Sequence, residues 1–168
     1  MAVLLLIDTC FWNHCKEVQE AGIWDLRDLL PRFRWGYTSA VLEEIKHYGL
    51  DGFVPIDRAM LIPATADEID SLKRFDPVLS EFDLADQSLL VAGRREKGLV
   101  LTDDGPLELE CMALDVATFR LPAFMLKLIQ DGFLDKTILS RCLRSWEQTG
   151  RYRKVDLKKW HAALQAIR

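Results

Sequence analysis

The stretch VLLLIDTCFW, residues 3–12, decides the fold class of this chain. Its first half, Val3 to Ile7, is an unbroken apolar run, which is typical of a strand buried on both faces in a parallel sheet. A second run of this kind extends from Leu99 to Thr102. Helical patterns follow both runs, so we predict an α/β protein: a three-layer α/β/α sandwich with a central, mostly parallel sheet.

The rest of the chain alternates short apolar runs with amphipathic stretches. We expect helices over residues 11–30 (interrupted near Gly22), 38–48, 65–75, 83–98, 106–113, 122–130, 136–148 and 157–167. Weaker strand patterns lie at 116–118 and at either 53–56 or 60–62. We predict a single domain over residues 1–168, with a core of about 1–120 and a helical C-terminal extension of about 121–168.

Composition places the chain among globular proteins, because 49% of its 168 residues are hydrophobic and 29% are charged. The early apolar run is too short to cross a membrane, and no signal-peptide pattern surrounds it. We therefore expect a cytoplasmic protein without a membrane partner. Its four cysteines are irregularly spaced, which predicts free thiols and leaves a zinc site without enough ligands.

Charge is distributed unevenly along the chain. Residues 141–168 hold eight Lys or Arg and two acids, a charge of +6, whereas the remainder has 14 basic and 24 acidic residues, a charge of −10. Within the basic segment, Arg151, Arg153 and Lys154 are candidate nucleic-acid contacts. A solvated helix face explains the same pattern. Trp146 and Trp160 could stack on bases, but their helical spacing favours the core.

Acidic residues stand where strands or loops meet helices. Asp8 directly follows the first apolar run, and Asp103 and Asp104 follow the second. In an open α/β sheet, ligands bind at the carboxyl ends of the strands, so these acids should lie at the same edge. Glu44 would reach that edge from one helix and Asp86 from the first turn of another. Clustered carboxylates favour a hard cation such as Mg²⁺ or Mn²⁺.

Each acid also has a structural explanation. Asp8 and Asp104 could cap the helices that follow them, and Asp86 could be the third residue of a capping box. Glu44 could be a surface acid, like its neighbour Glu43. The metal-binding interpretation gains weight because two of the acids follow the two clearest strands.

Four motifs in this order resemble the PIN domain family of metal-dependent nucleases: IDTCFW (7–12), TSAVLEEI (38–45), LADQSLLVAG (84–93) and VLTDDG (100–105). The resemblance covers about residues 3–120. It implies that Asp8, Glu44, Asp86 and Asp104 are the catalytic acids, with Asp8, Asp86 and Asp104 as metal ligands and Asp103 as an outer ligand. Supporting roles would fall to Thr9, Ser39 and Thr102.

The function expected from these residues is a Mg²⁺- or Mn²⁺-dependent endoribonuclease that hydrolyses single-stranded RNA. The resemblance also implies the toxin of a bacterial toxin–antitoxin pair, with an antitoxin protein and a second copy of the chain as candidate partners. Two alternatives stay open. One is a PIN-like module that binds RNA or protein without cleaving. The other is a metal-dependent phosphatase with Asp8 as its nucleophile, although Cys10 stands where a second Asp is typical.

Overall fold

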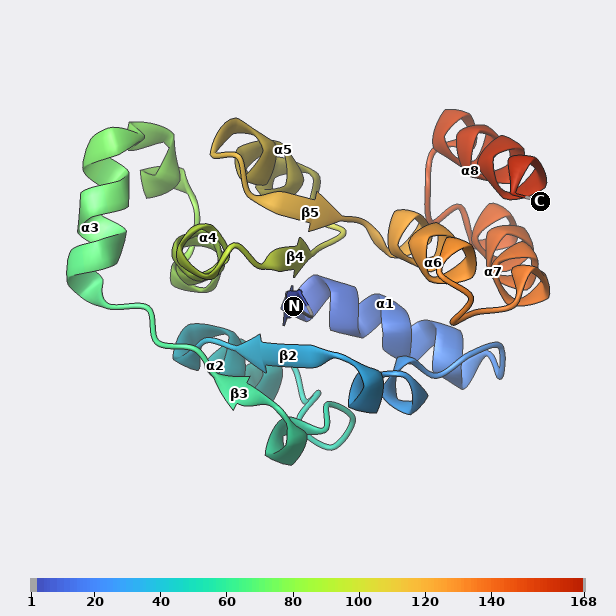
Figure 1. The fold of residues 1–168 in the computed structure, drawn as a ribbon, viewed down its shortest axis with the longest axis horizontal. Helices are drawn as coiled ribbons and strands as arrows, with labels where there is room; N and C mark the ends of the chain where they lie inside the picture. The colour runs from blue at the N-terminus through green and yellow to red at the C-terminus, as the bar shows by residue number, and fades with distance from the viewer. Residues whose placement is uncertain (1–2, 168) are drawn as a thin grey trace.

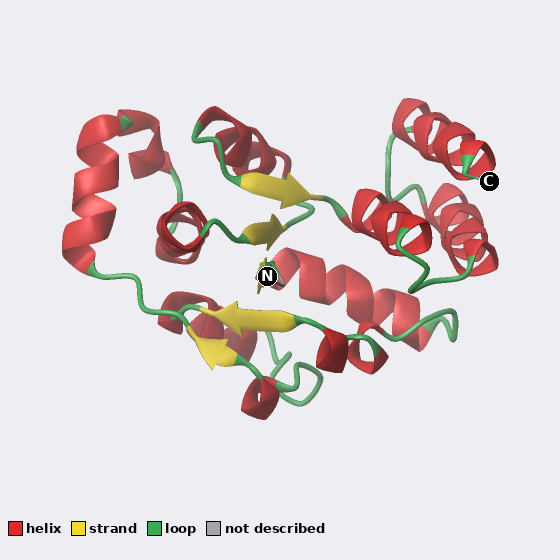
Figure 2. Cartoon of the chain, in the orientation of Figure 1, coloured by secondary structure: helices red, strands yellow, loops and turns green. Residues whose placement is uncertain are grey.

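The computed structural model describes residues 3–167 and contains one sheet of five parallel strands. The strands are β1 (Leu4–Ile7), β2 (Arg34–Tyr37), β3 (Met60–Leu61), β4 (Leu99–Leu101) and β5 (Ala117–Phe119). Their order across the sheet is β3-β2-β1-β4-β5, which places β1 in the centre (Figure 1). Helices flank this sheet on both sides (Figure 2), so the predicted three-layer α/β class is confirmed.

The helices connect the strands and extend the chain beyond β5. They are α1 (Thr9–Glu20), α2 (Ser39–His47), α3 (Ala66–Phe75), α4 (Leu84–Glu96), α5 (Gly105–Ala113), α6 (Leu121–Gln130), α7 (Lys136–Thr149) and α8 (Lys154–Ala166). Helix α4 lies against β1 and β4, α5 lies against β5, and α1 contacts both α2 and α6. Within residues 3–167, no helix has the length and apolar composition needed to cross a membrane.

Strand β1 is buried along its whole length, as its unbroken apolar sequence predicts. Leu6 and Ile7 have 0% of their surface exposed. The strand pairs with β2 on one side and with β4 on the other, with Ile7 opposite Leu101. Because both neighbours are parallel and helices cover both faces, every side chain of β1 has to be apolar. Helix α1 begins directly after Asp8, which is itself only 4% exposed.

The predicted C-terminal extension packs on the body through α1 and the loop after β4. Helices α6, α7 and α8 gather at one end of the molecule, opposite the end that carries α3 (Figure 1). The Phe124 ring of α6 lies edge-on to the ring of Phe11 in α1, with centroids 6.1 Å apart. Arg151 reaches Glu17 of α1 at 2.9 Å. The extension is therefore bound to the core by both apolar and polar contacts.

Two segments differ from the sequence-based prediction. The helix expected over residues 11–30 ends at Glu20, because Gly22 turns the chain with a φ of +64°, and two short 3₁₀ turns follow. Strand β2 was absent from the prediction. Its sequence RWGY has only four residues, too few for a pattern to identify it, and its pairing with β1, with Trp35 opposite Leu5, makes it a strand.

Gly36 of β2 permits the close approach of β3. A Cβ atom at this position would lie 2.5 Å from the carbonyl oxygen of Met60 and 2.9 Å from Cγ1 of Ile62. A backbone oxygen cannot move aside as a flexible side chain can, so the two strands would have to separate.

We predict that Gly36→Ala lowers the free energy of unfolding by about 1–3 kcal/mol, the usual cost of overpacking. Gly52→Ala is the matched control, because a Cβ atom there meets no heavy atom within 4 Å. Urea denaturation of both variants measures the difference. Equal stability of the two variants would contradict this account of β2.

Candidate active site

Two of the predicted acids follow the ends of paired central strands. Asp8 follows β1, and its backbone N–H donates to the carbonyl oxygen of Leu101 in β4 at 3.0 Å. Asp104 lies three residues beyond Leu101 and caps α5. Strand order reverses between β1 and β4, since the chain first builds β2 and β3 on one side and later β5 on the other. Such a reversal opens a crevice at the carboxyl ends of the strands, where α/β proteins bind ligands.

The other two acids come from helices that meet at this crevice. Glu44 belongs to α2 and Asp86 to α4, and these helices are in contact. A hydrogen bond between the buried hydroxyls of Thr38 and Ser88, 2.6 Å long, joins the two helices. Thr38 also caps α2 by accepting from the backbone N–H of Val41. Residues far apart in sequence therefore converge through helix packing.

Ser39 does not have the supporting role that was predicted for it. Its side chain is exposed, whereas the preceding Thr38 is fully buried and provides both the cap and the link to Ser88. The error is a shift of one residue, because the TSAVLEE segment offers two adjacent hydroxyls and a helix needs one of them as its cap.

The four predicted acids line one pocket of about 260 Å³. Its full lining is Asp8, Thr9, Cys10, Asn13, Glu44, Tyr48, Asp83, Asp86 and Asp104. Five of these residues are acids, and none of the lining residues in the described part of the chain is a lysine or arginine. The pocket thus concentrates negative charge without a basic side chain to balance it.

Hydrogen bonds anchor most of these carboxylates by a single oxygen. Asp8 accepts through Oδ2 from the hydroxyl of Thr102 and the thiol of Cys10, both at 2.7 Å. Glu44 accepts through Oε2 from the hydroxyl of Thr9 at 2.8 Å. Each anchored oxygen fixes the orientation of its carboxylate. The second oxygen, Oδ1 of Asp8 or Oε1 of Glu44, is bonded to no side-chain donor within residues 3–167.

The capping roles considered for these acids coexist with the pocket. Asp104 accepts through Oδ1 from the N–H of Leu107 at 2.8 Å, and Asp83 accepts through Oδ1 from the N–H of Asp86 at 2.9 Å. Both are N-caps that keep their Oδ2 atoms free of these bonds. Asp8 holds the N-cap position of α1 but makes no capping bond. A cap and a pocket ligand are therefore compatible functions of the same residue.

The electrostatics of the pocket are those of crowded, desolvated acids. Burial, followed by the charges of Asp8, Asp83, Asp104 and Glu44, raises the pKa of Asp86 from its usual value of 3.8 to about 8. Burial also raises the pKa of Asp8 and that of Glu44 above their ordinary values. Mutual repulsion of this kind is relieved either by protons or by a cation.

The residues present fit a hard divalent cation. Five of the nine lining residues offer carboxylate oxygens, the ligands that Mg²⁺ and Mn²⁺ prefer. No three His, Cys, Asp or Glu side chains in residues 3–167 are arranged tightly enough to grip a bare ion. The acids instead surround a space with room for water, which suits Mg²⁺ because this ion usually keeps several of its waters.

Asp103 lies outside the pocket, contrary to its predicted role as an outer ligand. Its side chain is 0% exposed and turns toward the C-terminal extension. Its oxygens accept from His14 Nδ1 at 2.8 Å, from the Tyr152 hydroxyl at 3.1 Å and from the N–H of Leu121 at 3.3 Å. Asp103 is therefore a structural anchor, and adjacent aspartates of the LTDDG turn point to different sites.

The predicted nucleic-acid contacts are largely engaged within the protein. Arg151 pairs with Glu17, and Arg153 pairs with Asp156 at 2.8 Å. Lys154 is exposed at the start of α8. These pairs reduce the free positive charge that the sequence of the extension suggests.

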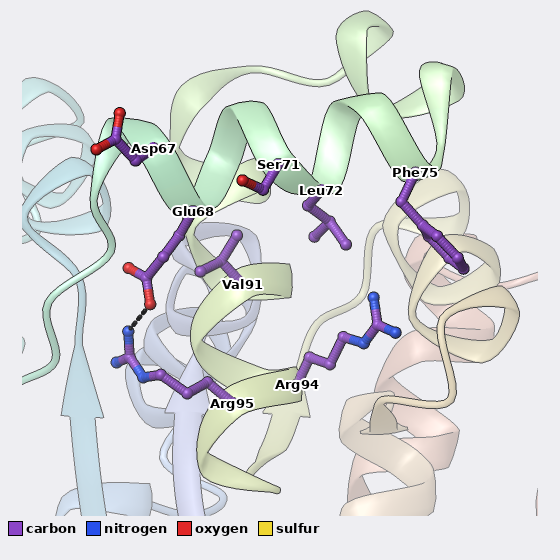
Figure 3. Close-up of a pocket in the computed structure, with 8 residues that line it drawn as sticks. All are labelled: Asp67, Glu68, Ser71, Leu72, Phe75, Val91, Arg94 and Arg95. Carbon is purple, nitrogen blue, oxygen red and sulfur yellow. Dashed lines mark hydrogen bonds and ion pairs between the residues drawn. The ribbon is translucent and has the colours of Figure 1, made fainter.

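A separate groove of about 490 Å³ lies between α3 and α4 (Figure 3). Its floor is apolar, with Leu72 and Val91, and Phe75 closes one end beside Arg94. An ion pair of 2.7 Å between Glu68 and Arg95 closes the other end. None of the predicted acids lines this groove, so it has no part in the acidic site.

Sequence reasoning missed several pocket residues. Asp83 was taken as a helix start alone, although its position three residues before Asp86 already placed it on the same edge. Asn13 and Tyr48 belong to none of the sequence motifs, and only the folded position of α1 and α2 brings them to the pocket.

Comparisons with models of known protein families and with curated proteins found no match. The functional argument therefore depends on the residues of this pocket.

We predict that Asp86→Asn stabilises the metal-free protein, and more so at high pH. With its raised pKa, folded Asp86 keeps a proton that unfolded Asp86 loses above about pH 4, so stability falls as pH rises toward about 8. Asparagine does not titrate and removes this loss. The gain in melting temperature should therefore be larger at about pH 9 than at about pH 5, by roughly 2–4 °C per kcal/mol of repulsion relieved.

Differential scanning calorimetry at the two pH values measures this gain. Asp70→Asn on the exposed side of α3 is the matched control and should show no pH-dependent gain. Added Mg²⁺ should shrink the advantage of Asp86→Asn, because it stabilises the parent protein instead. An equal gain at both pH values would refute the crowded-acid account.

Proposed function

We propose that the protein is a Mg²⁺- or Mn²⁺-dependent nuclease that hydrolyses phosphodiester bonds of single-stranded RNA. One observation carries the proposal: five acids line one pocket with no basic residue among the described lining, and burial, followed by the charges of the other four, raises the pKa of Asp86 to about 8. Carboxylates assembled at this cost to stability are more typical of a functional site than of a structural one. The PIN-like order of motifs supports the same activity.

Each side chain of the proposed site has a distinct role. Asp8, Asp86 and Asp104 would hold the ion, and Glu44, oriented by the hydroxyl of Thr9, would complete the acidic ring. A divalent ion in this position lowers the pKa of a bound water and neutralises charge on the phosphate. The hydroxyl of Thr102 keeps Asp8 in one orientation. No histidine lines the pocket within residues 3–167, which fits a reaction without a protein general base.

The resemblance also supports a biological setting for this activity. The protein is proposed as the toxin of a toxin–antitoxin pair that acts in the cytoplasm, with an antitoxin protein and a second copy of the chain as partners. Co-expression with the product of the neighbouring gene, followed by an assay for suppressed RNA cleavage, tests the antitoxin. Light scattering of the purified protein tests the dimer.

Two alternatives predict different results. A binding module without activity would bind RNA and leave it uncut in the presence of Mg²⁺ or Mn²⁺. A phosphatase would need Asp8 as a nucleophile, yet Asp8 is 4% exposed and its Oδ2 already accepts two hydrogen bonds. Trapping of a phosphorylated Asp8 would favour the phosphatase over the nuclease.

We predict that Asp8→Asn lowers metal-dependent cleavage of single-stranded RNA by about two orders of magnitude or more, because it removes a charge that the ion requires. The fold should survive, since the amide oxygen can still accept from Thr102 and Cys10. Asp70→Asn, far from the pocket on α3, should cleave like the parent. Unchanged cleavage by Asp8→Asn, or cleavage that resists EDTA, would exclude this mechanism.

A further inference from the structure

The acidic pocket poses a problem for any nucleic-acid substrate. Phosphates are repelled by its five acids, and the protein as a whole carries a charge of −4. Two of the arginines expected to attract RNA, Arg151 and Arg153, are already paired with acids of the protein. Most nucleic-acid binding draws its affinity from phosphate contacts. A strand that reaches this pocket therefore needs an attraction that does not depend on net positive charge.

Tyr48 can supply that attraction. It lines the acidic pocket and is 62% exposed, which is unusual for a large aromatic side chain in a folded protein. Its ring stands edge-on to that of His47, with centroids 5.0 Å apart, so a neighbouring ring limits its orientation. Asn13, a polar side chain able to bond base edges, lines the same pocket. An exposed ring beside a site for phosphodiester chemistry is suited to stacking on a base.

The end of α2 holds Tyr48 in place. The N–H of Tyr48 donates to the carbonyl of Glu44 at 2.9 Å, so the tyrosine lies one turn beyond a pocket acid. Gly49 follows with a φ of +66°, and the N–H of Leu50 closes the helix end on Ile45 at 2.8 Å. This arrangement is a Schellman motif, which fixes the backbone at a helix C-terminus. The position of the Tyr48 backbone relative to Glu44 is thus fixed before any ligand binds.

The tryptophans of the chain are occupied elsewhere. Trp12, Trp35 and Trp146 are buried, while Trp24 and Trp160 are packed against the core. Tyr48 is the aromatic residue that lines the acidic pocket within residues 3–167. Tyr48 is therefore the candidate stacking residue because it is exposed in the pocket, whereas the tryptophans are buried or packed against the core.

We propose that Tyr48 is a base-stacking platform that binds a nucleotide next to the scissile phosphate. The proposal rests on the proposed nuclease function and specifies its substrate: a single strand with at least one base free to leave its neighbours. A base-paired duplex keeps its bases stacked and cannot present one to Tyr48. The part of the binding free energy that Tyr48 contributes should depend only weakly on salt, because stacking releases few counterions.

The test is RNA binding in an Asp8→Asn background with Mg²⁺ present, so that the strand stays intact. Fluorescence anisotropy compares a short single-stranded RNA with strands in which one nucleotide at a time is replaced by an abasic one. Tyr48→Ala should weaken binding of the intact strand by about 10-fold, the loss of one stacked base, while Tyr48→Phe should bind like the background protein.

The abasic strands test whether the partner of Tyr48 is a base. One abasic position should weaken binding to the background protein by about the same factor, and should cause no further loss in Tyr48→Ala, because the contact is already absent. Phe75→Ala is the matched control. Phe75 is 69% exposed but lies in the α3–α4 groove, so its removal should leave RNA binding unchanged (Figure 3).

The outcomes separate this proposal from the nuclease proposal. If the parent cleaves RNA in a metal-dependent manner while Tyr48→Ala binds as tightly as its background, stacking is wrong and the nuclease stands. If Tyr48-dependent binding occurs without any cleavage by the parent, the platform stands and the nuclease fails. Absence of measurable single-strand binding, or equal losses from Phe75→Ala and Tyr48→Ala, would overturn the platform.

Discussion

The hydroxyl of Thr102 connects the two strands on which the candidate site depends. It donates to Oδ2 of Asp8 at 2.7 Å and accepts from the N–H of Asp104 at 3.0 Å. Thr102 is 0% exposed, so both bonds form away from water and hold their partners firmly. Together with the pairing of β1 and β4, this group fixes the end of β1 relative to the turn after β4. The pocket geometry follows from it, because Asp8 and Asp104 form one side of the pocket.

The pocket illustrates how a fold accommodates repulsion between neighbouring carboxylates. Each anchored acid has one oxygen bound to the scaffold, through Thr9, Thr102, Cys10 or a helix N-terminus. These bonds stabilise the ionised carboxylates while burial and mutual repulsion oppose them. Asp86 accepts no comparable bond within the described residues, and burial together with its acidic neighbours raises its pKa to about 8. The site is therefore folded but keeps mutually repelling carboxylates, and a bound cation would reduce this repulsion.

The sequence alone was enough to locate helices and strands that are specified by residues adjacent in the chain. The helix predicted from residue 65 is confirmed by α3, where Thr65 and Glu68 form a capping box, and the unbroken apolar runs before Asp8 and after Gly98 identified β1 and β4. Strand β2 escaped prediction because its identity depends on pairing with β1. The opposite directions of Asp103 and Asp104 escaped it for a similar reason, since the extension, through Tyr152, determines where Asp103 points. Local pattern thus predicted which acids stand at element ends, and tertiary contacts decided which of them face the pocket.

The anchoring of Asp103 has a consequence for how the chain can be divided. The resemblance to a known family covers only about residues 3–120, which suggests that the last three helices could be removed without loss. Their removal would take away the Tyr152 hydroxyl and the N–H of Leu121. The buried carboxylate of Asp103 would keep only the side chains of His14 and Arg120 as partners. An aspartate stripped of its donors is strongly destabilising. Because that aspartate adjoins Asp104, we expect the loss of the last three helices to disturb the pocket as well.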